Sequence, residues 1–468
     1  MWRNRMRIIR LFITLVFGLS LTFAVLWVME VQSSTAQAAP VVGSAEIPSA
    51  TTAELHVCLS GCDYSSVQAA VDAANEVDVI KVATGIYTGV NTYAGLAQVV
   101  YLSKTVTIQG GFTTTNWTTP NPEANLTTLD AQGQGRVMYI TGDIQPTIEG
   151  LRITGGDAQG LGGILSEEGW DLGSGVYVIT ATAEIRNNQV FSNTCSSLLC
   201  NGGGIAISYS DAIISGNTFH LNTTGWSGGG LWTGYSSPTI SANLFTSNHA
   251  FSGGGVELHM SAGTFSENLV ISNTAELGGG MSSHIGTEKI VNNVFADNHG
   301  SVGGGLVVSG SSPRLRHNTI AHNRGGDGSG IAVIQSFFGN YSTVDLTNTI
   351  LVDHSVGISV TGGNTATVNE VLWYATPITV SESITAAVSV HNEYSGDPAF
   401  GPDGYHLTAG SAAIDKGIDA GIIVDIDGEP RPAGAGYDLG ADELWYQIYL
   451  PLVLQVASPS QSMLPAER

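Results

Sequence analysis

Charged residues are scarce in this sequence, and basic residues are the scarcest. Only 12% of the 468 residues are charged, and 39 acidic residues stand against 16 lysines and arginines, which gives a formal net charge of −23. A chain this acidic repels nucleic acid and anionic membrane surfaces. Its 43% of hydrophobic residues exclude disorder, and its 60 glycines are too many for an ordinary helical domain. We therefore expect a folded, non-helical protein that does not bind nucleic acid.

Cysteine is also rare. The chain has four cysteines in two closely spaced pairs, Cys58 with Cys62 and Cys195 with Cys200. Metal binding is the weaker interpretation of these pairs, because no histidine or cysteine partners recur at zinc-ligand spacing. We expect two local disulfides, which are typical of proteins outside the cytoplasm.

A long uncharged run occurs near the N-terminus. Four arginines precede residues 11–29, and Ala36-Gln37-Ala38 follows them. A basic region, an apolar core and an A-x-A site are typical of a secretory signal, with cleavage near Ala38. The run is 19 residues long, so an uncleaved membrane anchor is the alternative. Cleavage would remove the four arginines and Glu30, which changes the net charge to −26 and leaves no transmembrane segment.

Glycine triplets recur along the chain with a period of about 25 residues. They lie at 202–204, 228–230, 253–255, 278–280 and 303–305, and 328–330 is a degenerate sixth copy. A second motif, of the form I-x-x-N-x-F-x-x-N, keeps the same period. Two markers in phase over about six units indicate one structural unit stacked on itself.

Short apolar alternations follow each triplet, as at Val256 and Leu258, and the repeats lack the i, i+3, i+4 spacing of a helix. Period-2 segments between glycine and asparagine bends predict about three strands per coil. The sequence therefore predicts an all-β solenoid, a parallel β-helix with about 25 residues per rung, whose coils stack at ~4.8 Å.

The first asparagine of each motif should form an internal ladder. Asparagine tolerates the left-handed conformation of a sharp bend, and its amide can bond to the asparagine one coil along. A role in contacting a ligand is the alternative. The ladder residues are Asn188, Asn217, Asn243, Asn268, Asn293, Asn318 and Asn348.

Both ends of such a stack would aggregate unless they are covered. A helix that includes Val67 and Val71, with Asp63 or Ser65 as its cap, is expected to cover the first coil. The expected organisation is a signal peptide (1–38), a linker (39–54), a cap helix with the first strands (55–98), β-helix rungs (99–395), a C-terminal cap segment (396–446) and an apolar strand with a disordered tail (447–468). The apolar part of that tail is too short to span a bilayer as a helix, so it packs or attaches to a surface.

These motifs resemble right-handed parallel β-helix repeat proteins of the pectate-lyase-like superfamily. Residues 410–443, which include GSAAIDKG and DIDGEPRPAGAGYDLGADE, look like the closing segment of secreted bacterial β-helix proteins called choice-of-anchor Q. The resemblance covers roughly residues 55–443 and implies the right-handed fold and a secreted location. It implies no particular chemistry, because such a fold hosts several activities. The D-D motif of polygalacturonase-like members is absent from this sequence.

Alternation after the triplets places the second and fourth residues on the outer side of one sheet, facing solvent. The residues that stack there are Trp232, Glu257, His259, Ser282 and His284. An outward Trp offers a flat face to a sugar ring. A glutamate with two histidines within ~5–7 Å could supply acid–base catalysis or hold a divalent cation.

The candidate catalytic residues are therefore Glu257, His259 and His284, and Trp232 and Ser282 join them as candidate substrate-binding residues. The alternative is a solvated strand that carries polar residues and one packed Trp. A second cluster, of Asp425, Asp427, Glu429 and Asp438, could bind calcium, which prefers several oxygen ligands. Its alternative is aspartates that cap turns, with Arg431 paired to one acidic group.

The favoured interpretation is a secreted, extracellular or cell-surface protein, monomeric, whose repetitive faces bind polysaccharide or neighbouring surface components. A polysaccharide-degrading enzyme, either pectate-lyase-like or a glycoside hydrolase, is the alternative. A purely architectural surface protein without a ligand is the third possibility.

Overall fold

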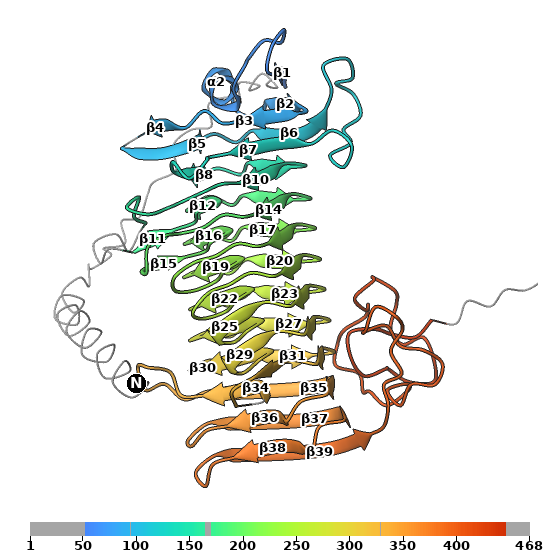
Figure 1. Cartoon of the computed structure of the whole chain (residues 1–468). Helices are drawn as coiled ribbons and strands as arrows, with labels where there is room; N and C mark the ends of the chain where they lie inside the picture. Colours follow the sequence, from blue (N-terminus) through green and yellow to red (C-terminus); the bar gives the residue numbers. More distant parts are fainter. Residues whose placement is uncertain (1–51, 94, 164–169, 328, 446–468) are drawn as a thin grey trace, which may run out of the picture.

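The chain winds into a parallel β-helix in a computed structural model that describes residues 52–445 except 94, 164–169 and 328 (Figure 1). The stack has about 13 turns of about 25 residues each, which confirms the predicted fold. The expected signal peptide, residues 39–51 of the expected linker and the expected tail (447–468) lie outside the described residues.

Each coil contributes strands to two long sheets, named here sheet 1 and sheet 2, and some coils add a third, narrow sheet. Sheet 1 consists, among the described residues, of β4 (Asn91–Tyr93), β5 (Leu96–Leu102), β8 (Arg136–Thr141), β12 (Val176–Ile179), β16 (Ile205–Ser208), β19 (Leu231–Gly234), β22 (Val256–His259), β26 (Met281–His284), β30 (Leu306–Ser309), β34 (Ser329–Ile334), β36 (Val356–Val360) and β38 (Ile378–Glu382). Its strands pair in parallel, except that β4 pairs antiparallel with β5.

Sheet 2 forms two adjoining columns of strands that bend at the asparagine positions. It consists, in the same described ranges, of β1 (Glu54–Val57), β2 (Val79–Ala83), β3 (Gly85–Tyr87), β6 (Thr107–Phe112), β7 (Thr127–Asp130), β9 (Thr147–Glu149), β10 (Arg152–Thr154), β13 (Glu184–Arg186), β14 (Gln189–Phe191), β17 (Ile213–Ser215), β18 (Thr218–His220), β20 (Thr239–Ser241), β21 (Leu244–Thr246), β23 (Thr264–Ser266), β24 (Leu269–Ile271), β27 (Lys289–Val291), β28 (Val294–Ala296), β31 (Arg314–Arg316), β32 (Thr319–Ala321), β35 (Thr343–Val352), β37 (Thr365–Tyr374) and β39 (Ala387–Ser395). The narrow sheet consists of β25 (Thr274–Leu277), β29 (His299–Val302) and β33 (Arg324–Gly325), and β11 (Asp171–Leu172) pairs with β15 (Cys200–Asn201).

Like side chains stack on like side chains inside the coil. Phe219, Phe245 and Phe295 share one column of paired positions with Val270, and Phe265 lies in the adjoining column between Ile240 and Ile290. All four phenylalanines are fully buried, and their ring centroids lie 4.6, 6.1 and 6.3 Å apart along the stack. Burying each such side chain contributes roughly 1.5–3 kcal/mol. The core is therefore a continuous column that runs from coil to coil, built from the apolar positions of the repeat.

The glycine triplets mark the place where neighbouring coils approach most closely. Gly253 has a positive φ of 59°, a conformation that only glycine adopts at little cost. A Cβ on Gly254 would lie 2.4 Å from the carbonyl oxygen of Gly279, and a Cβ on Gly255 would lie 2.7 Å from that of Gly280. A side chain at any of the three positions would thus push adjacent coils apart or strain the backbone.

The first asparagines of the repeat form an internal ladder. At Asn243, the side-chain Nδ2 donates to Asn268 Oδ1 (3.0 Å) and to the Ile214 carbonyl (2.9 Å), and the backbone N–H also donates to Asn268 Oδ1 (3.0 Å). The same pattern links Asn188, Asn217, Asn243, Asn268, Asn293 and Asn318. These side chains are at most 2% exposed, so their amides serve the fold.

The sequence analysis assigned the left-handed conformation at the bend to the ladder asparagine itself, and the structure differs. The left-handed residue is the one before each ladder asparagine, as at Ala242 (φ 54°), Glu267 (φ 58°) and Asn292 (φ 52°). Asn348 (φ 54°) occupies this preceding position and is not a ladder residue. Its Nδ2 lies 2.8 Å from His317 Nε2 and donates to the carbonyl of Ile418 (2.7 Å), so it fixes the C-terminal segment instead.

Helix α2 (Val67–Ala73) lies over the first coils, as predicted (Figure 1). Ser66, rather than Asp63 or Ser65, is the N-cap, and its side chain accepts a hydrogen bond from the Ala69 N–H. Two disulfides join Cys58 to Cys62 and Cys195 to Cys200, which confirms both predicted pairs. None of the described residues forms a helix long and apolar enough to cross a membrane.

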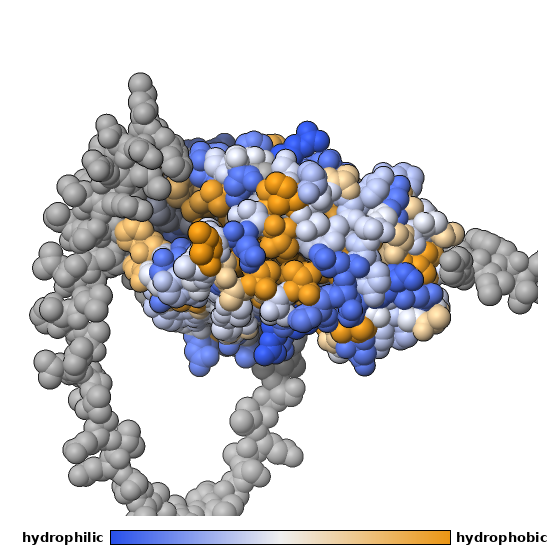
Figure 2. All heavy atoms as spheres, turned by 90° about the horizontal axis from the view of Figure 1, so that it is seen from below, coloured by the Kyte–Doolittle hydropathy of each residue, from blue (hydrophilic) through white to orange (hydrophobic). Residues whose placement is uncertain are grey.

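The C-terminal segment, residues 396–445, packs on the flank of the coil rather than across its open end (Figure 1). The backbone N–H of Ala441 donates to Thr319 Oγ1 (3.0 Å), and Asn292 Nδ2 donates to the carbonyl of Val424 (2.8 Å). The last coil keeps exposed apolar residues, among them Ile378 and Ile384. Figure 2 looks at this end of the stack and shows hydrophobic side chains near its centre.

We predict that Asn268→Ala lowers the free energy of unfolding by at least about 2 kcal/mol, because it removes the acceptor of the buried Asn243 backbone N–H, one acceptor of the Asn243 side-chain amide and the side-chain donor to the Ile240 carbonyl. Guanidinium unfolding followed by circular dichroism measures this change. Thr274→Ala, at an exposed position of the same coil, is the matched control and should change stability little. An Asn268→Ala protein that unfolds at the wild-type midpoint would contradict a structural ladder.

Candidate functional site

Sheet 1 brings the predicted site residues together on its outer side. Trp232, Glu257 and Ser282 occupy one column of paired positions on β19, β22 and β26. His259 pairs with His284 in the next column, and their rings stack with centroids 5.1 Å apart. The register that the glycine spacing predicted therefore places these side chains on neighbouring coils.

The sequence predicted that these side chains face solvent, but most of them are buried in the structure. Trp232, Glu257 and Ser282 are only 3%, 4% and 2% exposed. The indole of Trp232 lies flat over Gly234, where an added Cβ would be 2.2 Å from the ring. Trp232 also packs in a cluster with Leu172 and Tyr177 on the outer side of the sheet. It is a packed residue and offers no open face to a sugar.

Burial sets the protonation of the candidate catalytic residues. Glu257 Oε2 accepts a hydrogen bond from Ser252 Oγ (2.7 Å), and burial raises the pKa of Glu257 to about 7. Burial also lowers the pKa of His259 to about 3 and that of His284 to about 4. At neutral pH the two imidazoles are uncharged, and Glu257 holds its proton part of the time. Such a group can donate a proton, but it needs an opening through which a substrate enters.

An open groove lies beside this cluster, at the bend that follows sheet 1. Three residues at equivalent positions of successive coils, Tyr235, Met260 and Ile285, form its apolar part. Asp211 and Thr287 are among its polar lining residues. None of the three candidate catalytic residues lines it.

Tyr235, which lines the groove, stacks on Tyr209 of the preceding coil. The rings of Tyr209 and Tyr235 stack with centroids 5.0 Å apart and an interplanar angle of 5°. They are 45% and 37% exposed. Sequence reasoning missed this column, although the residue that follows each of β16, β19, β22 and β26 is bulky.

Two of the four predicted calcium residues, Asp425 and Asp438, accept backbone hydrogen bonds in turns of the C-terminal segment. Asp425 Oδ1 accepts from the N–H groups of Asp427 (3.0 Å) and Glu429 (2.8 Å). The two Asp438 oxygens accept from the N–H groups of Asp415 (2.7 Å) and Leu444 (2.9 Å). Turn capping, the alternative interpretation, therefore describes Asp425 and Asp438.

Arg431 also follows that alternative, because its Nη1 donates to Glu443 Oε2 (2.8 Å) within a fully buried ion pair. Within the described ranges, one group of three or more possible metal ligands has its donor atoms within 4.8 Å of one another. This group consists of His406, Asp427 and Asp442. Asp427 is the one member that the sequence also predicted as a metal ligand.

A second buried acid makes stability depend on pH. Glu288 is fully buried inside the coil, its Oε2 accepts from Ser283 Oγ (2.8 Å), and burial raises its pKa to about 7. The folded protein keeps a proton that the unfolded chain releases above pH 4.5, the ordinary value for this group. By linkage, this residue's contribution to stability is lost as pH rises from about 4.5 through 7.

We predict that Glu288→Gln removes a fall in unfolding free energy of about 3 kcal/mol between pH 5 and pH 8. Denaturant titrations at several pH values measure that slope. Glu382→Gln, at an exposed position, should leave it unchanged. An equal slope in wild type and Glu288→Gln would show that Glu288 ionises normally in the folded state.

Comparison with known proteins agrees with this architecture. The family described as "Right handed beta helix region" matches residues 136–313. No curated protein sequence matches the chain. Among solved structures the chain is similar to pectate lyase Pel9A, at 14% identity and a TM-score of 0.43 over 84% of this chain and 96% of that one.

Two further solved structures share the likeness at lower scores. The mannuronan C-5 epimerase AlgE6 A-module of Azotobacter vinelandii has 12% identity and a TM-score of 0.33, over 71% of this chain and 94% of that one. The tailspike protein of E. coli bacteriophage HK620, in complex with a pentasaccharide, has 11% identity and a TM-score of 0.24, over 73% of this chain and 64% of that one. The family match over residues 136–313 and the geometry of the coils both show a right-handed parallel β-helix fold.

Proposed function

We propose that this protein is a secreted or surface-displayed β-helix that binds a polysaccharide in the groove beside Tyr209 and Tyr235. The observation that carries the proposal is the pair of exposed tyrosine rings, stacked in parallel planes next to a groove with both apolar and polar lining. Aromatic faces accept the apolar faces of sugar rings, and neighbouring polar groups fix hydroxyl orientation.

Backbone conformation supports a functional reason for these side chains. Tyr209 (φ 49°), Tyr235 (φ 54°), Met260 (φ 47°) and Ile285 (φ 55°) all adopt the left-handed conformation. That conformation costs a bulky residue of order 1 kcal/mol or more, and glycine or asparagine would relieve it. Bulky side chains at four successive coils therefore indicate a benefit other than backbone stability.

Charge narrows the class of polysaccharide. The chain carries a formal net charge of −23, and Asp211 lies in the groove itself. A polyanion would be repelled by this surface, so a neutral or amino-sugar polymer is the matching ligand. The coils repeat along the groove, which suits a polymer of repeating sugars. Such a protein acts as a monomer and needs no cofactor for binding.

Location and attachment belong to the same proposal. The two disulfides and the signal-like N-terminus support secretion. The likeness of residues 410–443 to the choice-of-anchor Q segment supports attachment at a bacterial cell surface. There, the protein would hold polysaccharide or a neighbouring surface component.

We predict that replacing Tyr209 and Tyr235 together by asparagine weakens polysaccharide binding about tenfold or more, since the loss of ring stacking costs roughly 1–2 kcal/mol. Asparagine keeps the left-handed bend, so the fold should survive. A panel of neutral and acidic polysaccharides in affinity electrophoresis measures binding. Tyr374→Asn, also at an exposed tyrosine, is the control. Unchanged binding in the double variant would remove the groove from consideration.

A polysaccharide-degrading enzyme is the second candidate, because Glu257 has a pKa near 7 beside two neutral histidines. We expect incubation with the same polysaccharides to release neither new reducing ends nor the absorbance of unsaturated uronates. If the wild type forms such products and Glu257→Gln does not, the protein is an enzyme rather than a binding protein.

A further inference from the structure

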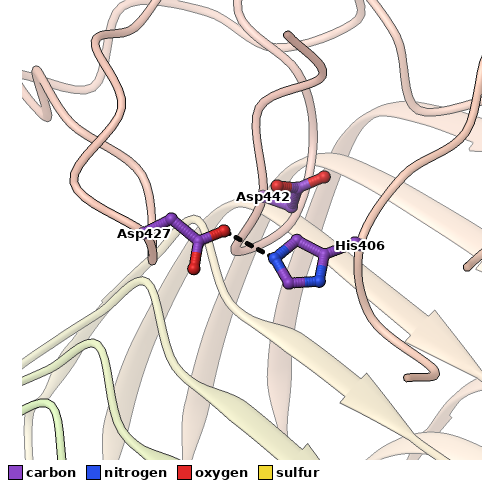
Figure 3. A group of neighbouring side chains, drawn as sticks. All are labelled: His406, Asp427 and Asp442. Carbon is purple, nitrogen blue, oxygen red and sulfur yellow. Dashed lines mark hydrogen bonds and ion pairs between the residues drawn. The ribbon is translucent and has the colours of Figure 1, made fainter.

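Turns of the C-terminal segment bring one histidine and two carboxylates together (Figure 3). His406 Nε2 lies 2.5 Å from Asp427 Oδ2, and one donor atom each of His406, Asp427 and Asp442 lies within 4.8 Å of the others. The three residues are 15 to 36 positions apart in the sequence, so they meet only because the segment folds back on itself. The arrangement is independent of the groove proposed to bind polysaccharide.

A fourth residue, Asp403, contacts the second ring nitrogen of His406 and orients the imidazole. His406 Nδ1 lies 2.6 Å from Asp403 Oδ2, on the side of the ring opposite Asp427. A carboxylate that receives the second ring N–H is the usual partner of a metal-binding histidine, because it fixes the tautomer and directs the other nitrogen to the ion. Here that arrangement leaves Nε2 facing Asp427.

Asp442 is the buried member of the group. It is 5% exposed, and its Oδ2 accepts a hydrogen bond from the Leu407 N–H (2.6 Å). No donor among the described residues reaches its other oxygen, Oδ1. Burying a carboxylate is costly unless a cation or several donors compensate it, so a bound cation would stabilise the charge of Asp442.

No lysine or arginine among the described residues forms an ion pair with Asp442. Arg431 is engaged by Glu443 and by the carbonyls of Gly440 and Ala441. Three carboxylates, from Asp403, Asp427 and Asp442, thus surround one imidazole. Even a protonated His406 leaves an excess of negative charge at this point, which a divalent ion would neutralise.

We propose that His406 Nε2 and the carboxylates of Asp427 and Asp442 bind a divalent first-row transition ion, for which Zn²⁺ is the best match. Zinc takes imidazole nitrogen and carboxylate oxygen in a four-coordinate site, whereas calcium requires six to eight oxygens. Three protein ligands leave one position for water. This assignment replaces the calcium set predicted from the sequence.

The ion would act as a staple for the C-terminal segment. Residues 396–445 contain no strand or helix among their described positions. A small apolar cluster, which includes Leu407 and Leu439, and side-chain hydrogen bonds hold them to the flank. Segments with so little core are commonly stabilised by a metal that binds only the folded state. Ligands from three separate turns would lock those turns together.

The experiment measures Zn²⁺ binding to the full-length protein after dialysis against a chelator. Isothermal titration with ZnCl₂ should show one site of micromolar affinity or tighter, and saturating Zn²⁺ should raise the melting temperature by several degrees. Asp442→Asn and His406→Gln should each weaken binding at least about tenfold, and Asp403→Asn should do so by about 10–100-fold through misorientation of the ring.

His322→Gln is the matched control, because His322 and Asp353 form an exposed pair (3.1 Å) without a third carboxylate. It should bind Zn²⁺ like the wild type. The proposal is overturned if the wild type binds no Zn²⁺ at 100 µM, if Ca²⁺ binds more tightly than Zn²⁺, or if His406→Gln and Asp442→Asn bind as tightly as the wild type. The alternative is that the site binds no ion and that a protonated His406 simply bridges Asp403 and Asp427. In that case, treatment with a chelator would leave the melting temperature unchanged.

Discussion

Backbone hydrogen bonding between successive coils is the constraint on which the structure depends. Every coil must present its N–H and C=O groups to the next along nearly its whole length, so side chains at equivalent positions have to be compatible with one another. The glycine triplets satisfy this condition by removing side chains where a Cβ would lie within 3 Å of the next backbone. The asparagine ladder satisfies it at the bend, where regular strand pairing is interrupted and the amides supply the missing bonds.

The same stacking explains why polar groups occur inside this protein. A buried asparagine is costly alone but well paired when an identical residue lies one coil away. Glu257 and Glu288 have no such repeating partner, and each bonds to a serine hydroxyl. Their raised pKa values couple the charge state of the coil to the pH of its surroundings. The periodic polar groups are thus neutral contributors to the fold, whereas the isolated acids make it sensitive to pH.

Both proposed binding sites lie where the repeat does not dictate the residue type. Inside the coil each position is fixed by the coils above and below it, whereas the bend after sheet 1 faces outward and accepts bulky residues at the cost of backbone strain. The C-terminal segment, which has no repeat, packs on the flank through Asn292, Thr319 and Asn348. A repetitive scaffold therefore carries two distinct surfaces, one proposed to bind sugar polymers and one proposed to hold a metal ion.

The sequence alone determined the features that depend on period. The coil length and the ladder from Asn188 to Asn318 follow from the repeat, because the stack copies sequence period into spatial register. Both disulfides follow from the close spacing within each cysteine pair. The prediction of Asn348 as a ladder residue was wrong, because a longer loop precedes it and its motif lacks the second asparagine that would fix the register. Pairing of Leu315 with Leu346 sets Asn348 opposite His317.

Only the tertiary structure decided what covers the outer side of sheet 1 and which residues meet in the C-terminal segment. Alternation predicts the side of a strand to which Trp232 points, but not whether other parts of the molecule pack over it. His406, Asp427 and Asp442 belong to separate turns without periodicity, and no spacing rule relates them. Contacts between stacked coils can be predicted from residue spacing in the sequence. Contacts that form when a non-repetitive segment folds against itself or against the coil cannot.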